Sequence, residues 1–193
     1  MSPKKMLILA SESPRRKELL SSICPEFEIC SADVEEMSSG ADIFLLPETN
    51  AKLKADAVAG LHPDALVIGA DTAIIFENRF IGKPANRNEA KALLMSFSGK
   101  KHFVVTGVAL IRHGKNPLEV SYREVSEIEF KNIGSKTIDD YLEMVYVLDK
   151  AGAYAIQEHG SMLIDHYTGE LENIIGLPLV RLKKLLREQQ ITG

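Results

Sequence analysis

The sequence predicts an α/β protein built around a mixed, strongly twisted sheet with flanking helices, in a single domain of two lobes over residues 1–193. Apolar runs at 7–10 and 66–70 have the composition of buried strands, and stretches with the spacing of amphipathic helices separate them. Two long β-patterned runs, 102–112 and 118–130, flank a loop that contains Gly and Pro. This pattern favours a long antiparallel hairpin beside strands that are joined through helices.

The N-terminal half begins with a strand that leads directly into a helix. Ser13 is expected to cap this helix, and Pro14 suits its first turn because no amide donor is needed there. The pattern then predicts a helix at 15–23, a strand at 27–30, a mobile loop at 37–42, a helix at 47–59 and a strand at 66–70 that continues extended to 76. Residues 77–79 turn the chain into a hairpin that leads to 81–84.

The C-terminal half places helices before and after the long hairpin. Apolar spacing predicts a helix at 87–97, ended by Gly99, which suits the left-handed residue after a helix. After the hairpin we expect a helix at 137–145, capped by Ser135 or Thr137, then strands at 153–156 and 161–164 and a basic amphipathic helix at 178–188.

Composition narrows the partners and the compartment. The formal net charge of −4 argues against broad binding to nucleic acid or to membrane surfaces, so any anionic ligand needs a local basic cluster. No apolar run approaches the roughly 20 residues needed to cross a bilayer. Cys24 and Cys30 lack a partnering motif, and the histidines lack metal-ligand spacing and are expected on the surface or in the core. We therefore expect a cytoplasmic protein with two free thiols.

The junction at 10–16 is the clearest candidate binding site. A strand that feeds a helix N-terminus leaves free backbone N–H groups and the positive end of the helix dipole at one point. Arg15 and Arg16 stand beside that point and offer paired donors for an anion, so phosphate is the expected ligand. By pattern alone, a capped helix with two solvated arginines explains the same residues equally well.

Polar side chains also follow other apolar elements, where α/β proteins usually bind ligands. These residues are Glu35, Glu36, Lys52, Lys54, Asp71, Thr72 and Lys83. Carboxylates hold Mg²⁺ through oxygen and bases neutralise phosphates, so the set suits a metal-bound polyphosphate. Each residue has a plain alternative: Asp71 could cap a turn, and Glu36 could be a solvated loop acid. Lys52 and Lys54 could be charges on a helix surface.

Six segments, in order along the chain, resemble those of the Maf family of nucleoside triphosphate pyrophosphatases, which is historically linked with septum formation. The segments are 10–16, 69–72, 82–84, 98–99 together with His102 and 106–110, 149–157 and 173–179, including Ala-Ser-Glu-Ser-Pro-Arg-Arg, Gly-Ala-Asp-Thr and Gly-Lys-Pro. One short motif would be a weak signal, whereas six in order over nearly the whole chain are a strong one.

The resemblance implies hydrolysis of a nucleoside triphosphate between its α and β phosphates, with Mg²⁺ or Mn²⁺, in the cleft of a Maf/ITPase-like fold. It implies that Asp71 is the general base and shares the metal with Glu36. It also implies that the phosphates are bound by Ser11, Arg16, Lys54 and Lys83.

The resemblance further implies that Arg15, Thr72 and Gln157 choose the base. The branch that acts on 7-methyl-GTP has an aromatic residue, a glutamine and a glutamate at these positions, so this chain resembles the dTTP/UTP branch. The chemistry agrees, because the Gln157 amide offers both a donor and an acceptor to the imide edge of uracil or thymine.

The leading hypothesis is thus a cytoplasmic, metal-dependent pyrophosphatase of dTTP, UTP and modified pyrimidine nucleotides. The alternative is a non-catalytic, nucleotide-sensing regulator of cell division, which needs the basic cluster but no metal-bound pair of carboxylates. A third reading, an enzyme of the same fold that removes purine deamination products, is disfavoured by the base-choosing residues. No nucleic-acid or membrane partner is expected, and the long hairpin and the resemblance are compatible with a homodimer.

Overall fold

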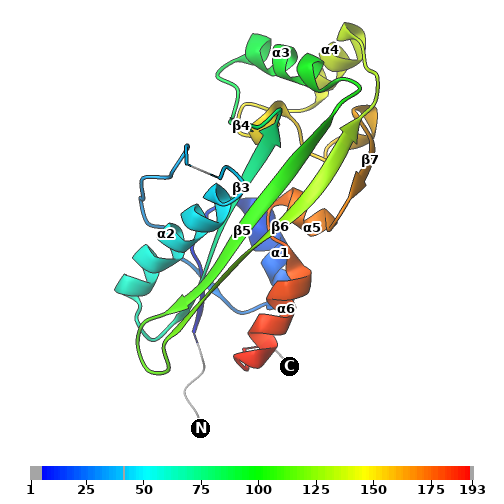
Figure 1. Cartoon of the computed structure of the whole chain (residues 1–193). Coiled ribbons are helices and arrows are strands. Elements are labelled where there is room, and N and C mark those ends of the chain that lie inside the picture. The colour runs from blue at the N-terminus through cyan, green and yellow to red at the C-terminus, as the bar shows by residue number, and fades with distance from the viewer. Residues whose placement is uncertain (1–5, 41, 192–193) are drawn as a thin grey trace. The chain divides into compact units, whose positions relative to one another are not determined.

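The structure is a computed structural model that describes residues 6–40 and 42–191 (Figure 1). The helices are α1 (Pro14–Ser21), α2 (Leu46–Leu61), α3 (Arg87–Phe97), α4 (Ser135–Met144), α5 (Leu171–Ile175) and α6 (Leu179–Glu188), with 3₁₀ turns η1 (Ala151–Ala153) and η2 (Gly160–Met162). The strands are β1 (Leu7–Leu9), β2 (Glu28–Ile29), β3 (Leu66–Phe76), β4 (Arg79–Ile81), β5 (Lys101–Arg112), β6 (Leu118–Phe130) and β7 (Ile164–Thr168).

The strands form a seven-stranded sheet in the order β2-β1-β3-β5-β6-β7, with β4 paired to β3. β1 is parallel to β2 and β3, whereas β4 is antiparallel to β3 and β7 is antiparallel to β6. The predicted mixed α/β fold class is therefore confirmed. β5 and β6 are neighbours, and their bounds differ from the predicted runs by no more than one residue.

The chain folds into two compact units. The first comprises Met1–Thr72, Thr106–Glu124 and Gly176–Gly193, and the second comprises Ala73–Val105 and Val125–Ile175. β5 and β6 each give residues to both units, as does β3, which passes from the first to the second after Thr72. Each unit has its own buried core.

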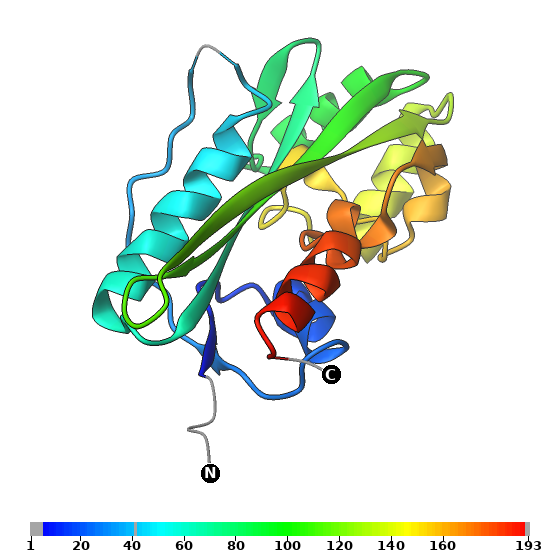
Figure 2. The same cartoon turned by 60° about the horizontal axis from the view of Figure 1, so that its bottom comes forward.

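In the first unit, alternate strand residues face two different helical layers, as the period of two along a strand requires. Ile8 and Val67 belong to a buried cluster with Ala55 of α2. Leu9, the next residue of β1, belongs to a second cluster with Leu182 of α6. Figure 2 shows the strands of this unit running between α2 on one side and α1 and α6 on the other.

Two glycines allow α2 to approach the sheet closely. A Cβ atom on Gly69 would lie 2.2 Å from the backbone oxygen of Ala51, and Gly107 is equally close to the backbone of α2. A backbone cannot turn aside as a side chain can, so both positions require glycine. The close approach sets the buried face of α2 against β3, and that face carries Asn50.

The second unit contains an aromatic core around His102, which is 1% exposed. Its ring stacks on Phe97 with 4.5 Å between the centroids, and its Nε2 lies 2.8 Å from the Tyr154 hydroxyl oxygen. Burial lowers the pKa of His102 to about 3, because desolvation disfavours the charged ring. His102 is therefore a neutral core residue at physiological pH.

The predicted strand at 153–156 is wrong, and so is the one at 161–164 except for Ile164, where β7 begins. Ala153 (φ 61°) and His159 (φ 55°) adopt the left-handed backbone conformation, and so does Gly152 (φ 72°). A strand cannot continue through such residues, so the segment forms η1, η2 and turns. The pattern also missed β7 and the single-turn helix α5.

Three further local predictions concern the end of α3, the cap of α4 and the loop before α2. Gly99 adopts φ 67° after α3, as predicted. The N-cap of α4 is Gly134, so the predicted caps Ser135 and Thr137 are wrong; the helix begins at Ser135 itself. In the loop predicted at 37–42, residue 41 lies outside the described residues, and the rest contains no helix or strand.

Two predictions drawn from composition can also be compared with the structure. Cys24 and Cys30 are free thiols, as expected. Among the residues that the structure describes, no helix is both long and apolar enough to span a bilayer.

Candidate active site

The junction between β1 and α1 differs from the predicted cap in one detail. Ser13 occupies the N-cap position and Pro14 begins the helix, as expected, but the Ser13 hydroxyl makes no capping hydrogen bond. Instead, the Ser13 N–H donates to Oγ of Ser11 at 3.3 Å. This bond joins two residues of the connection between β1 and α1, and it holds the Ser11 hydroxyl close to the start of the helix.

Arg16 is fixed by three hydrogen bonds within the first unit. Its Nε donates to the carbonyl oxygen of Gly176 at 2.9 Å and its Nη1 to Ser11 Oγ at 3.1 Å. Its Nη2 donates to Thr72 Oγ1 at 3.0 Å, and this oxygen lies 3.0 Å from Oγ1 of the buried Thr106. The interpretation of Arg16 as a solvated arginine is therefore wrong.

The pKa of Arg16 is shifted in opposite directions by burial and by neighbouring charges. Burial lowers the pKa of Arg16, and the attraction of Asp71 opposes this shift. The half-buried Arg15 adds a smaller repulsion that lowers the pKa of Arg16 further. Guanidinium groups stay protonated in proteins, so two cations stand at the start of α1.

Asp71 forms the second part of the site. Its Oδ1 accepts a hydrogen bond from Nζ of Lys54 at 2.7 Å, and its Oδ2 accepts one from Nδ2 of Asn50 at 3.1 Å. The same Lys54 Nζ lies 2.8 Å from Oε1 of Glu36. One ammonium group thus links the two carboxylates that the sequence singled out as metal ligands.

The alternatives left open by the sequence can now be decided residue by residue. Asp71 caps no turn: it lies within β3, which runs on to Phe76, so its predicted place at a strand end is also wrong. Lys54 is not a plain surface charge, because it joins two acids at 16% side-chain exposure. Lys52 does belong to the surface, where it pairs with Glu119. Glu36 is an exposed loop acid, but one with a cationic partner.

The residues present fit a divalent cation of the magnesium type. Carboxylate oxygens are the donors that Mg²⁺ and Mn²⁺ prefer, and Glu36 and Asp71 lie close enough to share one ammonium group. No cluster of three or more His, Cys, Asp or Glu side chains with metal-binding geometry occurs in residues 6–40 and 42–191. A site with two protein carboxylates suits Mg²⁺, which keeps several waters and binds substrate phosphates.

Sequence reasoning missed Asn50, which is 1% exposed and contacts Asp71 directly. The available signal was its place on the apolar face of α2, next to the buried Ala51. A polar residue on a buried helix face needs hydrogen-bond partners, and those partners can lie in a functional site. Sequence reasoning also did not select the buried Thr106 of β5 as a site residue, although its Oγ1 lies 3.0 Å from Oγ1 of Thr72.

Lys83 and Gln157 belong to the second unit and are both exposed. The segments that carry them are joined by a hydrogen bond from the Gly152 N–H to the Gly82 carbonyl oxygen at 3.1 Å. Lys150, whose side chain is 7% exposed, holds the Gln157 segment through Glu158, with 3.4 Å between Nζ and Oε1. Its ammonium also donates to Asp149 Oδ1 at 3.0 Å and to the carbonyl oxygen of Tyr146, and a buried ammonium requires such partners.

Comparison with known families and proteins gives consistent matches. Residues 6–189 match the family model described as Maf-like protein. The dTTP/UTP pyrophosphatase of Bacillus cereus (strain Q1) is 43% identical over 189 residues, which cover 96% of each chain. The dTTP/UTP pyrophosphatase of Bacillus anthracis is similar to the same extent.

Solved structures share the fold at low sequence identity. The Ham1 protein of Staphylococcus aureus superposes with a TM-score of 0.57 and 17% identity, over 96% of this chain and 100% of that one. A HAM1 protein from Coxiella burnetii gives a TM-score of 0.54 and 16% identity, over 95% and 99% of the two chains. These likenesses concern the fold alone.

Proposed function

The chain belongs to the Maf family, and we propose that it hydrolyses dTTP and UTP to the nucleoside monophosphate and pyrophosphate. The names of its relatives support the pyrimidine substrates. The observation that carries the proposal is the link from Lys54 to both Asp71 and Glu36, in the same unit as Arg16. An acid pair with adjacent cations is what cleavage of a phosphoanhydride requires.

In the proposed reaction, a water oxygen bonds to the α phosphorus while the bond to the bridging oxygen breaks and pyrophosphate leaves. Asp71 accepts the proton of the water. Its hydrogen bonds with Lys54 and Asn50 use one acceptor position on each oxygen, so capacity remains for this proton. Arg16 and Lys54, together with Lys83, neutralise phosphate charge that would repel the nucleophile.

Glu36 and Asp71 are the proposed ligands of Mg²⁺ or Mn²⁺, which when bound supplies further positive charge at the phosphates. Ser11 completes the proposed phosphate-binding set because its hydroxyl lies beside the Arg16 guanidinium. A cytoplasmic location belongs to the same proposal and is supported by the two free thiols. The homodimer stays a prediction from the sequence.

The proposal is tested by the products formed from dTTP, UTP, GTP and 7-methyl-GTP. With Mg²⁺ or Mn²⁺ present, dTTP and UTP should yield the monophosphate, and orthophosphate should appear only after inorganic pyrophosphatase is added. With EDTA, turnover should stop. The EDTA arm is best read by chromatography of the nucleotides, because the coupling enzyme itself needs a metal.

Two outcomes would contradict the proposal. Orthophosphate released without the coupling enzyme would place cleavage at the γ phosphate. Tight binding of UTP with no product of any kind would favour the nucleotide-sensing regulator, which needs the cations but not the acid pair.

Exchanging Gln157 for glutamate tests the proposed base selection. Glutamate offers only acceptors, so it would repel a pyrimidine carbonyl and leave it without a donor. We expect Gln157→Glu to lower kcat/KM for UTP and dTTP by about 10- to 100-fold, the effect of a lost hydrogen bond plus repulsion. Steady-state kinetics over the four nucleotides measures this change.

The matched control is Gln189→Glu. Gln189 Oε1 accepts a hydrogen bond from Arg112 Nη2 at 3.1 Å, and a glutamate oxygen would keep it. This exchange adds the same charge outside the proposed site and should leave selectivity unchanged. If Gln157→Glu also left selectivity unchanged, Gln157 would have no role in choosing the base.

A further inference from the structure

The buried side chain of Asn50 joins two parts of the site that are distant in sequence. Its Oδ1 accepts the N–H of Met37 at 2.8 Å, and its Nδ2 donates to the carbonyl oxygen of Met37 at 3.0 Å. The same Nδ2 donates its second hydrogen to Asp71 Oδ2 at 3.1 Å. Both donor hydrogens and the acceptor oxygen of the amide are therefore used.

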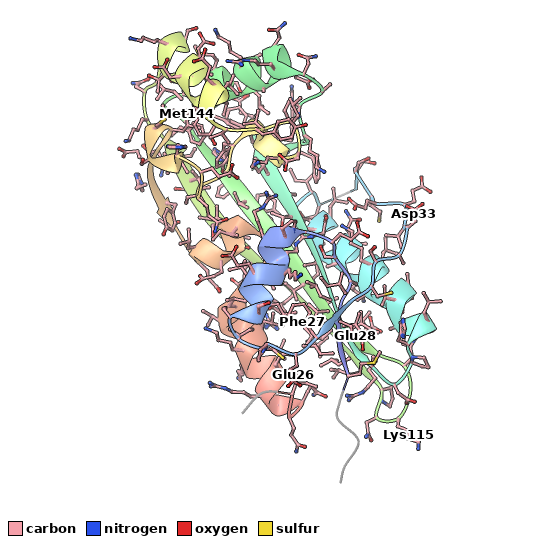
Figure 3. The ribbon with its side chains drawn as sticks, turned by 180° about the vertical axis from the view of Figure 1, so that it is seen from behind. Glu26, Phe27, Glu28, Asp33, Lys115 and Met144 are labelled. Carbon is pink, nitrogen blue, oxygen red and sulfur yellow. The ribbon has the colours of Figure 1, made fainter. Side chains whose placement is uncertain are left out.

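The two bonds to Met37 hold a segment that has no regular structure of its own. Residues 30–40 form no helix or strand between β2 and α2, and the Met37 side chain is exposed. In Figure 3 this segment, which carries the label of Asp33, passes beside α2 after β2, where Glu28 is labelled. Since Asn50 binds the Met37 backbone through both its N–H and its C=O, it fixes the peptide position directly after Glu36.

The bond to Asp71 acts on the other acid. Asn50 and Lys54 are four residues apart on α2, so both reach β3 from the same face of the helix. Lys54 binds Oδ1 of Asp71 and Asn50 binds Oδ2. Held at both oxygens, the carboxylate is restrained from rotating about its Cβ–Cγ bond.

We propose that Asn50 is a positioning residue that presents Asp71 and the Glu36 segment together, an inference that rests on the proposed hydrolysis. Asn50 touches neither substrate nor the reacting atoms in this scheme; it acts through Asp71 and through the Met37 backbone. Without it, the described contact that holds Glu36 to the site is its ion pair with Lys54, and the Glu36 side chain in this pair is 54% exposed, so solvent weakens the attraction.

Two substitutions separate the two halves of this role. Asn50→Leu has a similar shape but removes every hydrogen bond to Met37 and Asp71. Asn50→Asp keeps an acceptor for the Met37 N–H, loses both donors and brings a second negative charge against Asp71 Oδ2. Each variant is measured by hydrogen exchange of the Met37 amide and by kcat and KM for UTP.

We expect Asn50→Leu to speed exchange of the Met37 amide by about tenfold and to lower kcat by about 10- to 100-fold, with a smaller change in KM. Asn50→Asp should retain more of the Met37 protection yet lose at least as much kcat, because it disturbs Asp71 rather than the segment. If Asn50 had a purely structural role, both variants would lower the folded fraction, and the order of their effects on Met37 exchange would match the order of their effects on kcat.

The control is Asn86→Ala, which removes the side-chain cap of α3, where Asn86 Oδ1 accepts the Glu89 N–H at 3.0 Å. This variant should lose stability while keeping wild-type kcat and KM. If Asn50→Leu does not fold, the test rests on Asn50→Asp. Turnover by Asn50→Asp at the wild-type rate would then overturn the inference.

Failure of the inference and failure of the proposed function give different results. An active wild-type protein whose Asn50→Leu variant keeps kcat within twofold and a slow Met37 amide would overturn the role of Asn50 alone. An inactive wild-type protein would overturn the proposed hydrolysis, and with it the catalytic half of the inference.

Discussion

Replacing Asp71 by asparagine is expected to lower kcat for UTP by about 10²–10⁴-fold, the usual contribution of a general base. The amide has nearly the same shape as the carboxylate, and its one remaining oxygen can still accept a hydrogen bond. It cannot accept the proton of the attacking water, and it offers a cation one neutral donor atom in place of a charged oxygen. The loss of kcat is measured by quenching the reaction at set times and quantifying UMP by chromatography.

Nucleotide binding should survive this change, because Arg16 keeps its contacts with Ser11 and Gly176. Calorimetry with a non-cleavable UTP analogue should therefore give a dissociation constant close to that of the wild type. Asp139→Asn is the matched control, since Asp139 of α4 pairs with Lys91 of α3 in an exposed ion pair outside the proposed site. Turnover by Asp71→Asn within tenfold of the wild type would remove Asp71 from the role of general base.

The parts of the fold that could be predicted are those in which local pattern and tertiary environment agree. α3 has the bounds that its spacing predicted, because a capped amphipathic helix needs only one apolar face. β6 likewise has its predicted bounds. Its buried positions alternate with more exposed ones, which is the pattern of a strand covered on one side.

The segment from 151 to 164 could not be predicted in this way. Its apolar residues are buried or partly buried, as a strand would suggest, but its conformation depends on contacts that sequence spacing does not record. The Gly152 N–H bonds to the Gly82 carbonyl, and the Ala155 N–H bonds to the Tyr141 hydroxyl at 3.0 Å. These distant acceptors satisfy the backbone and permit left-handed residues where a strand pattern was expected.

The candidate site shows the same division. Arg16 and Asp71 lie in segments that resemble a family, and the resemblance also implied Lys54; the structure places these three side chains in one unit. Asn50 carried no motif, and its partners lie 13 and 21 residues away in sequence. A residue whose role depends on such contacts can be recognised only after the helix and the strand are placed together.

Arg16→Lys is expected to lower kcat/KM for UTP by about 100-fold, through a higher KM and a lower kcat together. The Arg16 guanidinium reaches Gly176, Ser11 and Thr72 through three different nitrogens. A single ammonium cannot reproduce this planar fork, so at least one of these acceptors loses its donor. Lysine preserves the positive charge, so the loss of kcat/KM measures the contribution of the guanidinium's hydrogen-bond geometry rather than that of its charge.

Arg87→Lys provides the control, because Arg87 is exposed on α3, where its Nη2 lies 3.9 Å from Oε1 of the exposed Glu143. Exposed pairs of this kind contribute about 0–1 kcal/mol, so its kinetics should equal those of the wild type. Arg16→Lys should also lower the melting temperature, since buried acceptors are left without a donor. If Arg16→Lys kept the wild-type kcat/KM, charge alone would suffice at this position, and the three hydrogen bonds of Arg16 would serve the fold rather than the reaction.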